Sequence, residues 1–468
     1  MFQGTSGEGS GVCEKTLRRK NRRGKQMSDG AEKKELLKFG DCMSFCIGQI
    51  IGSGIMVLTG IALARTGRGV PLGFVVAAAI IMITMVPLAV LGAGMPGTGG
   101  NYVYVRELIG RKSGFVYVVM FAVSQCLIST FALGFADYLI AVVPGVNRTL
   151  AAMALLIVCT GFNMVGVKTA AKLQTAMVVV LLVALGAYIV FGLPKVNFAG
   201  FFEPGAIMPN GFLNFLQASA LLYFPMGGAK FIAELGGDIE NPGKNIPRSM
   251  FLSTGIVAIF YALMGVVAAG VLPIDQVAGK TLVVSAQEIF PRPIYLFFVI
   301  GGALFALATT LNGTLSWITK GLYVAAKEGW IPESMADENK YGVPYKLLIV
   351  FFIIGAVPIL TGMDVSFISS LGVGLTVICN VLPVGSAFFF AEKKPEAYKN
   401  ATFKVSVPAL KAFSVVSIIL LLATGWLNLR DLTMPTWISL VVFAILCVLY
   451  ANVREKKVIE KAQANGGK

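Results

Sequence analysis

The sequence predicts an all-α polytopic membrane protein with about twelve transmembrane helices. Two observations carry this prediction. Only 13% of the 468 residues are charged and 56% are hydrophobic, whereas a typical soluble domain carries about 25% charged residues. Apolar runs of about 20 residues, each long enough to cross a bilayer, recur along the whole chain. They span residues 40–64, 71–95, 114–141, 149–166, 174–194, 211–236, 249–272, 293–322, 347–363, 366–391, 409–429 and 433–452.

The distribution of basic residues predicts the orientation of these spans. Lysine and arginine gather in alternate loops and at both ends of the chain, as at Arg106, Lys172, Arg248 and Lys320. Cytoplasmic loops of membrane proteins carry such an excess of positive charge. We therefore expect a multi-pass protein of the plasma membrane with both termini in the cytoplasm. The net charge of +15 is explained in this way and does not indicate nucleic-acid binding.

Residues 1–38 form the first element, a polar segment rich in Gly, Ser and Lys. A segment of this composition does not bury enough apolar surface to fold, so we expect a disordered, basic cytoplasmic tail. Its basic cluster between Arg18 and Lys25 would also favour the anionic inner leaflet of the membrane.

The first span contains a run of small residues, Gly52, Ser53 and Gly54. A glycine inside a helix costs about 1 kcal/mol relative to alanine. One interpretation is close packing against a neighbouring helix. The other is a break in the helix, which is tolerated at mid-membrane where the freed backbone groups line a cavity or bind a ligand. Amides at the start of the second half-helix would then favour an anion such as a substrate carboxylate.

The sixth span contains a matching interruption, in which Pro225, Gly227 and Gly228 occur within four positions. This combination disfavours a continuous helix. Breaks in the first helix of each half are typical of transporters built from inverted repeats. The predicted organisation is a five-helix repeat over residues 39–195, a second five-helix repeat over 205–391, helices 11 and 12 over 408–453 and a cytoplasmic tail over 454–468.

The composition argues against an enzyme and against a metal centre. The chain contains no histidine, which is the commonest general acid–base and metal ligand. Its seven cysteines are irregularly spaced and mostly lie in or beside spans, where buried thiols act as small apolar residues. Gly97, Gly99 and Gly100 lack the Lys-Ser/Thr of a phosphate-binding loop. A channel would need a filter motif or a ring of like charges, and the sequence shows neither.

Four motifs carry a resemblance to a known family: Ile51–Ile55, Pro96–Arg106, Asn241–Arg248 and Asn312–Pro332. In this order they resemble motifs of the amino acid–polyamine–organocation (APC) permeases of the bacterial amino acid permease type. The resemblance implies the leucine-transporter type of fold, with helices 1 and 6 broken. It also implies secondary active transport of amino acids by alternating access, as a symporter or an exchanger. The alternatives are transport of another amine or carboxylate metabolite, and a nutrient sensor that does not transport.

Mapped onto this sequence, the resemblance implies a substrate site at the two breaks. The amides of Gly52, Ser53 and Gly54 would bind the carboxylate of an amino acid. Carbonyls freed by both breaks would meet its ammonium group, and the ring of Phe224 would cap the substrate. The residues expected in the site are Ile50, Ile51, Gly52, Ser53, Gly54, Phe224, Pro225, Gly227, Gly228 and Lys230.

Lys230 departs from the family pattern, because several relatives carry a carboxylate or an amide at this position. A lysine at mid-membrane costs about 2.5–3.5 kcal/mol, so something should offset it. Three explanations stay open: an i, i+4 ion pair with Glu234, a contact with an anionic group of the substrate, or a neutral lysine that exchanges a proton. A charged Lys230 would favour neutral or acidic substrates over cationic ones.

The resemblance implies coupling to sodium or protons and no other cofactor. The helix-five lysine of some proton-coupled relatives is replaced here by Leu181. Thr309, Thr310 and Thr314 place hydroxyls where the family's sodium site would lie, although threonine hydroxyls in helices often bond to carbonyls of their own helix. The expected partners are a small-molecule amino acid or related substrate and the lipid bilayer, and no nucleic acid is expected.

Overall fold

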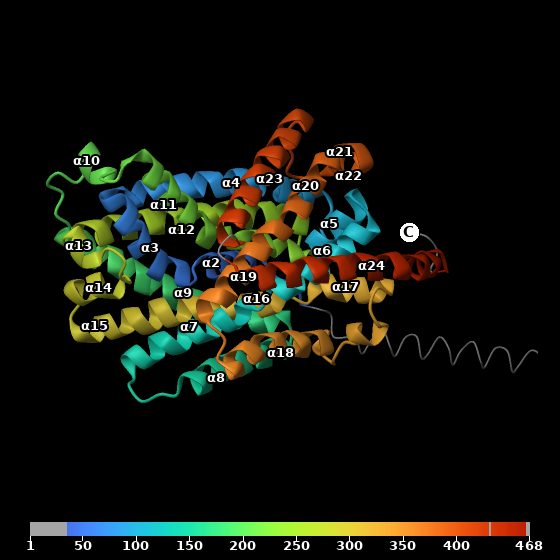
Figure 1. The fold of residues 1–468 in the computed structure, drawn as a ribbon, viewed down its shortest axis with the longest axis horizontal. Helices are drawn as coiled ribbons and strands as arrows, with labels where there is room; N and C mark the ends of the chain where they lie inside the picture. The colour runs from blue at the N-terminus through green and yellow to red at the C-terminus, as the bar shows by residue number, and fades with distance from the viewer. Residues whose placement is uncertain (1–34, 430–431, 465–468) are drawn as a thin grey trace, which may run out of the picture. The chain divides into compact units, whose positions relative to one another are not determined.

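The computed structural model describes residues 35–429 and 432–464. This part of the chain consists of helices and contains no strand (Figure 1). The longer α-helices are α2 (Phe39–Ile50), α3 (Ser53–Thr66), α4 (Val70–Gly94), α5 (Gly100–Leu108), α6 (Arg111–Ser124), α7 (Leu127–Val142), α8 (Arg148–Met164), α9 (Val167–Gly192), α11 (Gly211–Met226), α12 (Pro242–Gly270), α16 (Phe305–Trp317), α17 (Lys320–Glu328), α18 (Tyr345–Thr361), α19 (Val365–Cys379), α23 (Val407–Leu429) and α24 (Met434–Ala464).

Shorter elements connect or extend these helices. The short α-helices are α10 (Pro204–Ile207), α13 (Ile274–Val277), α14 (Val283–Ile289), α15 (Arg292–Phe297), α20 (Val381–Ser386), α21 (Phe390–Lys393) and α22 (Pro395–Asn400). The 3₁₀ segments η3 (Gly227–Glu234) and η4 (Gly236–Asp238) continue α11, and the π segment η5 (Phe298–Leu304) joins α15 to α16.

The described residues confirm an all-α polytopic membrane protein. Eight helical segments are long and apolar enough to cross a membrane, and two shorter apolar helices, Arg148–Met164 and Tyr345–Thr361, accompany them. Each of the twelve apolar runs falls on helix. The exact number of twelve crossings stays a prediction, as do the repeat boundaries. The predicted tail lies almost entirely in residues 1–34, outside the described part.

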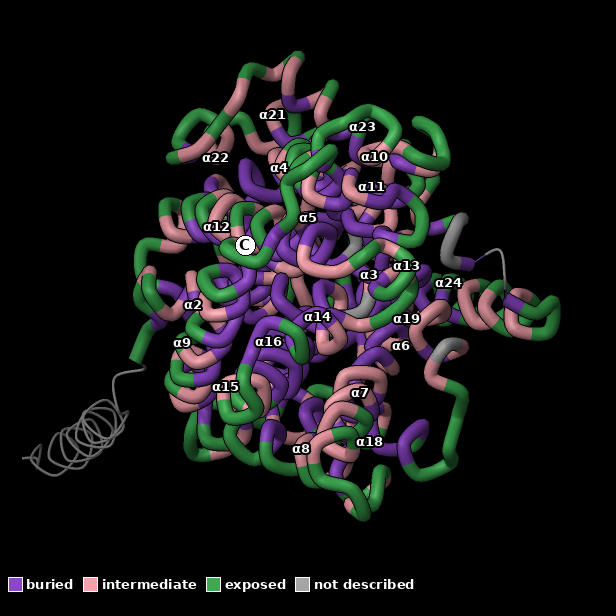
Figure 2. The backbone as a smooth tube through the Cα atoms, turned by 90° about the vertical axis from the view of Figure 1, so that its left-hand side faces the viewer, coloured by how far each residue is buried: buried purple, intermediate pink, exposed green. Residues whose placement is uncertain are grey.

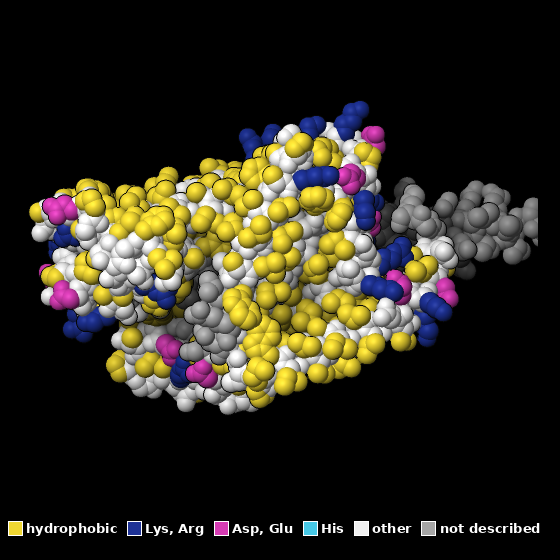
Figure 3. Space-filling view, turned by 45° about the horizontal axis from the view of Figure 1, so that its top comes forward, with side chains coloured by type: hydrophobic (Ala, Val, Ile, Leu, Met, Phe, Trp, Pro, Cys, Tyr) yellow, Lys and Arg dark blue, Asp and Glu magenta, His cyan; other side chains and the backbone are white. Residues whose placement is uncertain are grey.

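The surface of the bundle shows why it needs a bilayer. Hydrophobic side chains cover most of the face drawn in Figure 3, while lysine, arginine and acidic side chains gather toward its ends. Large apolar residues are more than half exposed on several helices, among them Leu150 on α8, Val190 on α9 and Ile259 on α12. Lipid tails satisfy such side chains without the cost of exposing them to water. The buried residues lie inside the bundle (Figure 2).

The helix α2 lies at the middle of the bundle, against α9, α12, α16 and η3 (Figure 1). The helix α3, which follows α2 in the chain, packs against α11, which precedes η3. The two halves of the first span therefore lie beside the opposite halves of the sixth span. This crossed pairing brings the two interruptions to one place.

One end of the bundle carries α5, α17 and the end of α24, and we call it the basic end (right in Figure 1). Polar contacts hold it together: the Tyr102 hydroxyl donates to Glu328 at 2.6 Å, Arg106 also contacts Glu328, and Lys394 pairs with Glu107 at 2.6 Å. Burial by itself would raise the pKa of the Glu107 carboxyl, but Lys394 and Arg106 hold that pKa below its ordinary value. These contacts tie α5 to α17 and to the segment before α22.

Candidate functional site

The first span is broken after Ile50, as its glycines predicted. The helix α2 ends there, Ile51 leaves the helical conformation with ψ 90°, and Gly52 is extended at φ −117° and ψ −156° before α3 begins at Ser53. The Gly52 amide donates to the Ile50 carbonyl at 3.0 Å. The first amides of an α-helix have no partner within it, and no side chain caps the start of α3. Its positive end is thus available to an anion.

The sixth span changes helical type at its interruption and does not unwind. The α-helix α11 ends at Met226, one residue after Pro225, and the chain continues as the 3₁₀ segment η3 from Gly227. Proline removes one amide donor and blocks the usual i→i−4 bond. The tighter 3₁₀ pattern lets the segment keep most of its backbone hydrogen bonds while it crosses the bundle.

The two breaks touch, and glycine makes the contact possible. A Cβ added at Gly54 would lie 2.3 Å from the Cβ of Pro225, and one added at Gly228 would lie 2.1 Å from the carbonyl oxygen of Gln49. Any side chain at these positions would push the first and sixth spans apart. The structure therefore brings Gly54 of the first break against Pro225 of the second, and Gly228 against the backbone of Gln49 and Ile50, while Gly52 lies against Thr310 and Gly227 against Ile81.

Long-range hydrogen bonds fix the backbone around the first break. The Tyr261 hydroxyl on α12 donates to the Ile50 carbonyl at 3.1 Å. The side-chain amide of Gln49 donates to the Thr310 carbonyl at 2.8 Å, and the Thr310 hydroxyl donates to the Gly48 carbonyl at 3.1 Å. Carbonyls that the break would leave unpaired are thereby partly satisfied. Sequence reasoning missed Gln49 and Tyr261, because neither stands out from other polar residues within an apolar run.

The three threonines of α16 mostly bond within their own helix. Thr309 and Thr310 donate to the Ala306 carbonyl at 2.9 Å, and Thr314 donates to the Thr310 carbonyl at 2.8 Å. This is the local arrangement that the sequence left open as the alternative to an ion site. Thr310 additionally reaches the first span, and so does Thr314, whose hydroxyl lies 3.4 Å from the Gln49 side-chain oxygen. The threonines thus line the first break, and an ion-coupling role stays a prediction.

Lys230 makes no ion pair with Glu234 in the described structure, which therefore does not show the first of the three explanations left open for Lys230; its role stays a prediction. The reason for the missing pair is the 3₁₀ geometry of η3: with three residues per turn, residues four apart point about 120° away from each other. Lys230 instead lies in line with Gly227, and its Nζ stands 5.3 Å from the centre of the Phe231 ring. The side chains of Phe224 and Ser53 lie outside the described residues, so the capping role of Phe224 stays a prediction.

An aromatic stack borders the site toward the basic end. The Phe231 ring on η3 stacks on Trp317 of α16 with a centroid distance of 4.4 Å and an interplanar angle of 8°. Phe121 of α6 lies 6.0 Å from Phe231 and 5.9 Å from Trp317. The Trp317 indole donates to Gln49 at 3.2 Å. This stack links the first, third, sixth and eighth spans beside the second break.

Comparison with known proteins places this geometry in context. A family described as amino acid permease matches residues 37–450. The branched-chain amino acid permease BcaP of Bacillus subtilis is 24% identical over 437 residues, 88% of this chain and 92% of that protein. The uncharacterized protein MJ0609 of Methanocaldococcus jannaschii is 26% identical over 310 residues, 64% of this chain and 71% of that protein. The aromatic amino acid transport protein AroP of Escherichia coli is 22% identical over 349 residues, 71% of this chain and 75% of that protein.

Proposed function

The chain belongs to the amino acid permease family, and from that premise we propose that it is a secondary active transporter of neutral amino acids. It moves them across the plasma membrane by alternating access, with the basic end in the cytoplasm. The excess of lysine and arginine at that end supports this orientation.

The observation that carries the proposal is the contact between the two breaks. Gly54 meets Pro225, and Gly228 meets the Gln49 backbone, at distances that exclude any side chain. Polar backbone at mid-membrane is tolerated where it lines a site or is buried in protein. Two half-helix ends that converge on one spot give the two kinds of partner that an amino acid needs. These are amides for a carboxylate and carbonyls for an ammonium group.

The surroundings favour a neutral substrate over a dication. The uncapped amides at the start of α3 suit the carboxylate. The residues at the two breaks include a cation, Lys230, and no acidic side chain. A diamine would need carboxylates to replace its water. Two relatives, by their names, carry branched-chain and aromatic amino acids, which supports an apolar substrate side chain here.

Counterflow in proteoliposomes tests the proposal. Vesicles loaded with an unlabelled neutral amino acid should accumulate its labelled form transiently, and methyl esters of the same amino acids should not compete because their carboxylate is masked. The variant Gly54→Leu should insert normally and lose counterflow. Gly161→Leu is the matched control, since Gly161 lies on the exposed face of α8 with nothing within 4 Å. Saturable binding without counterflow would indicate a sensor, and flux without saturation would indicate a channel.

A further inference from the structure

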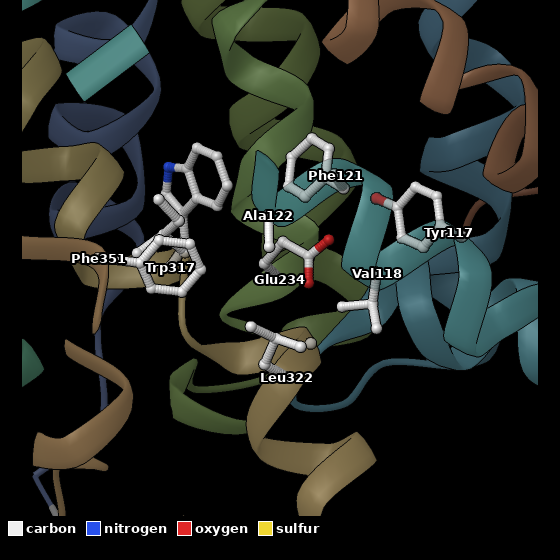
Figure 4. Close-up of a pocket in the computed structure, with 10 residues that line it drawn as sticks. Tyr117, Val118, Phe121, Ala122, Glu234, Trp317, Leu322 and Phe351 are labelled. Atoms are coloured by element: carbon white, nitrogen blue, oxygen red, sulfur yellow. The ribbon is translucent and has the colours of Figure 1, made fainter. Parts of the chain in front are cut away.

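A buried carboxyl group lies just beyond the second break. Glu234 is the last residue of η3 and is 3% exposed. Its side chain lines a small cavity, with a volume of about 10 Å³. Figure 4 shows the carboxyl group between Phe121 and Val118, with the hydroxyl of Tyr117 turned toward it. The rest of the lining is mostly apolar and includes Trp317, Leu322 and Phe351.

Buried polar groups without charge surround this carboxyl. The Asn101 amide and the hydroxyls of Tyr104 and Tyr117 are buried beside it, and the Asn101 amide lies within reach of both the Glu234 carboxyl and the Tyr117 hydroxyl. All three side chains lie close enough to Glu234 to interact with it electrostatically. Buried polar groups are rarely left unpaired. The Glu234 carboxyl therefore has neutral polar neighbours with which it can exchange hydrogen bonds.

No cation neutralises Glu234 in the described part of the chain. On its own element, Lys230 points elsewhere, over the Phe231 ring. On α17, Lys320 pairs with Asp238 at 2.7 Å. The remaining titratable neighbours, Tyr104 on α5, Tyr117 on α6 and Cys379 on α19 beside Tyr117, carry no positive charge in any state.

An ionised carboxylate buried without a counter-charge is very unfavourable. A neutral carboxylic acid has both a donor and an acceptor, and the Asn101 amide and the tyrosine hydroxyls beside Glu234 can pair with either. The protonated form is therefore the one that this enclosed arrangement stabilises. The ionised form needs water, and water reaches the carboxyl when the protein around it opens.

The backbone of Glu234 takes part in the contacts between η3, η4, α5 and α17 that close the basic end, and we call this set of contacts the seam. Its carbonyl accepts the Gly99 amide at 3.0 Å, and Thr98 and Leu235 form a β-bridge beside it. The buried Asp238–Lys320 pair lies on the same seam. A substrate that leaves the breaks toward the basic end must part these contacts between η3, η4, α5 and α17. Opening the seam would admit water to the Glu234 carboxyl.

We propose that Glu234 is the proton-binding site of the transport cycle, resting on the proposed transport function. Its carboxyl holds a proton while the basic end is closed, as in this structure. When that end opens, the O–H bond breaks, the proton passes to water on that side, and the carboxylate stays hydrated until it is protonated again. The chemistry identifies the ligand as a proton and not a metal cation, because the cavity lining offers one carboxyl and one phenol in otherwise apolar surroundings.

Infrared difference spectroscopy on the purified protein tests the proton site without any substrate. The parent protein should show a protonated carboxyl stretching band at neutral pH, and Glu234→Gln should lose it. Asp137→Asn is the matched control, because Asp137 lies half-exposed in an ion pair with Arg148, and it should keep the band. Tyr117→Phe, which retains the ring, should shift the band. This second variant keeps the test decisive if Glu234→Gln does not fold.

Counterflow against pH tests the coupling. The parent rate should fall on the alkaline side by about tenfold per pH unit once Glu234 deprotonates, while Glu234→Gln should exchange substrate with a flat profile. A parent spectrum without the band, or with a band that Glu234→Gln retains, would overturn the proton site, as would stabilisation of the parent by sodium at this carboxyl. A band with unchanged pH profiles would overturn the coupling. If no amino acid gives counterflow, the proposed function fails, and the spectra still decide whether Glu234 holds a proton.

Discussion

Replacing Gly228 with alanine tests whether the contact between the two breaks is essential. The added methyl carbon would lie 2.1 Å from the Gln49 carbonyl oxygen, 2.3 Å from its carbon and 2.8 Å from the Ile50 amide nitrogen. All three are backbone atoms and cannot rotate away. A Cβ is essentially never found within 3.0 Å of another heavy atom, so the first and sixth spans must separate by about 0.9 Å, the difference between 3.0 and 2.1 Å.

The size of this displacement gives the expected effects. An extra methyl group in a well-packed interior typically costs about 1–3 kcal/mol, which a protein of this size tolerates. A misplacement of about 1 Å in a positioned site can lower the rate by about 100-fold. We therefore expect Gly228→Ala to fold with a modest loss of thermal stability and to lose about two orders of magnitude in counterflow rate.

The assay compares initial counterflow rates at equal amounts of reconstituted protein, together with thermal unfolding of the same preparations. Gly186→Ala on α9 is the matched control, because nothing lies within 4 Å of an added Cβ there. Alanine is favoured over glycine in a helix interior by about 1 kcal/mol, so the control should be as stable as the parent or more so. The reasoning is refuted if Gly228→Ala transports at the rate of Gly186→Ala.

Three further predictions concern charge. Lys230→Met keeps the apolar stem but removes the charge. The variant should fold and should either lose most uptake or shift the pH dependence of uptake. Curves of uptake against pH that match those of the parent, with and without sodium, would assign Lys230 no functional role. Asp238→Asn should destabilise the protein by about 3–5 kcal/mol in thermal or denaturant unfolding, because it leaves Lys320 buried and unpaired. The control Asp137→Asn, at the exposed pair with Arg148, should cost at most about 1 kcal/mol. Equal losses of stability in the two variants would contradict this prediction. Putrescine and cadaverine should not be taken up with high affinity, and saturable uptake of either would exclude the proposed substrate class.

The positions of the breaks could be predicted because their causes are local. Gly52 and Gly54, and then Pro225 with Gly227 and Gly228, mark places where α-helical hydrogen bonding is unfavourable whatever surrounds them. These residue types do not determine what replaces the α-helix. The 3₁₀ course of η3 depends on packing against α2 and α5, which no local pattern encodes.

The missing ion pair between Lys230 and Glu234 has the same cause. The ion pair with Glu234 assumed 3.6 residues per turn, and the structure has three. The hydrogen-bond partners of Gln49 and Tyr261 could not be predicted from the sequence either. The contact of Gln49 with Thr310 spans 261 positions of the chain, and that of Tyr261 with Ile50 spans 211 positions. Composition shows that such polar side chains are unusual in a membrane helix, but only the fold shows which backbone groups they meet.

The aromatic stack beside the breaks gives the protein an intrinsic fluorescent reporter, Trp317. The chain has four tryptophans, and Trp317 is buried face to face with Phe231 while its indole nitrogen donates to Gln49. Indole emission responds to both of these features of its surroundings, the neighbouring ring and the hydrogen bond. Because Gln49 belongs to α2 and Phe231 to η3, any motion of either span relative to α16 changes the environment of one chromophore. With the other three tryptophans replaced by phenylalanine, fluorescence from Trp317 would follow the transport cycle in real time without an attached dye.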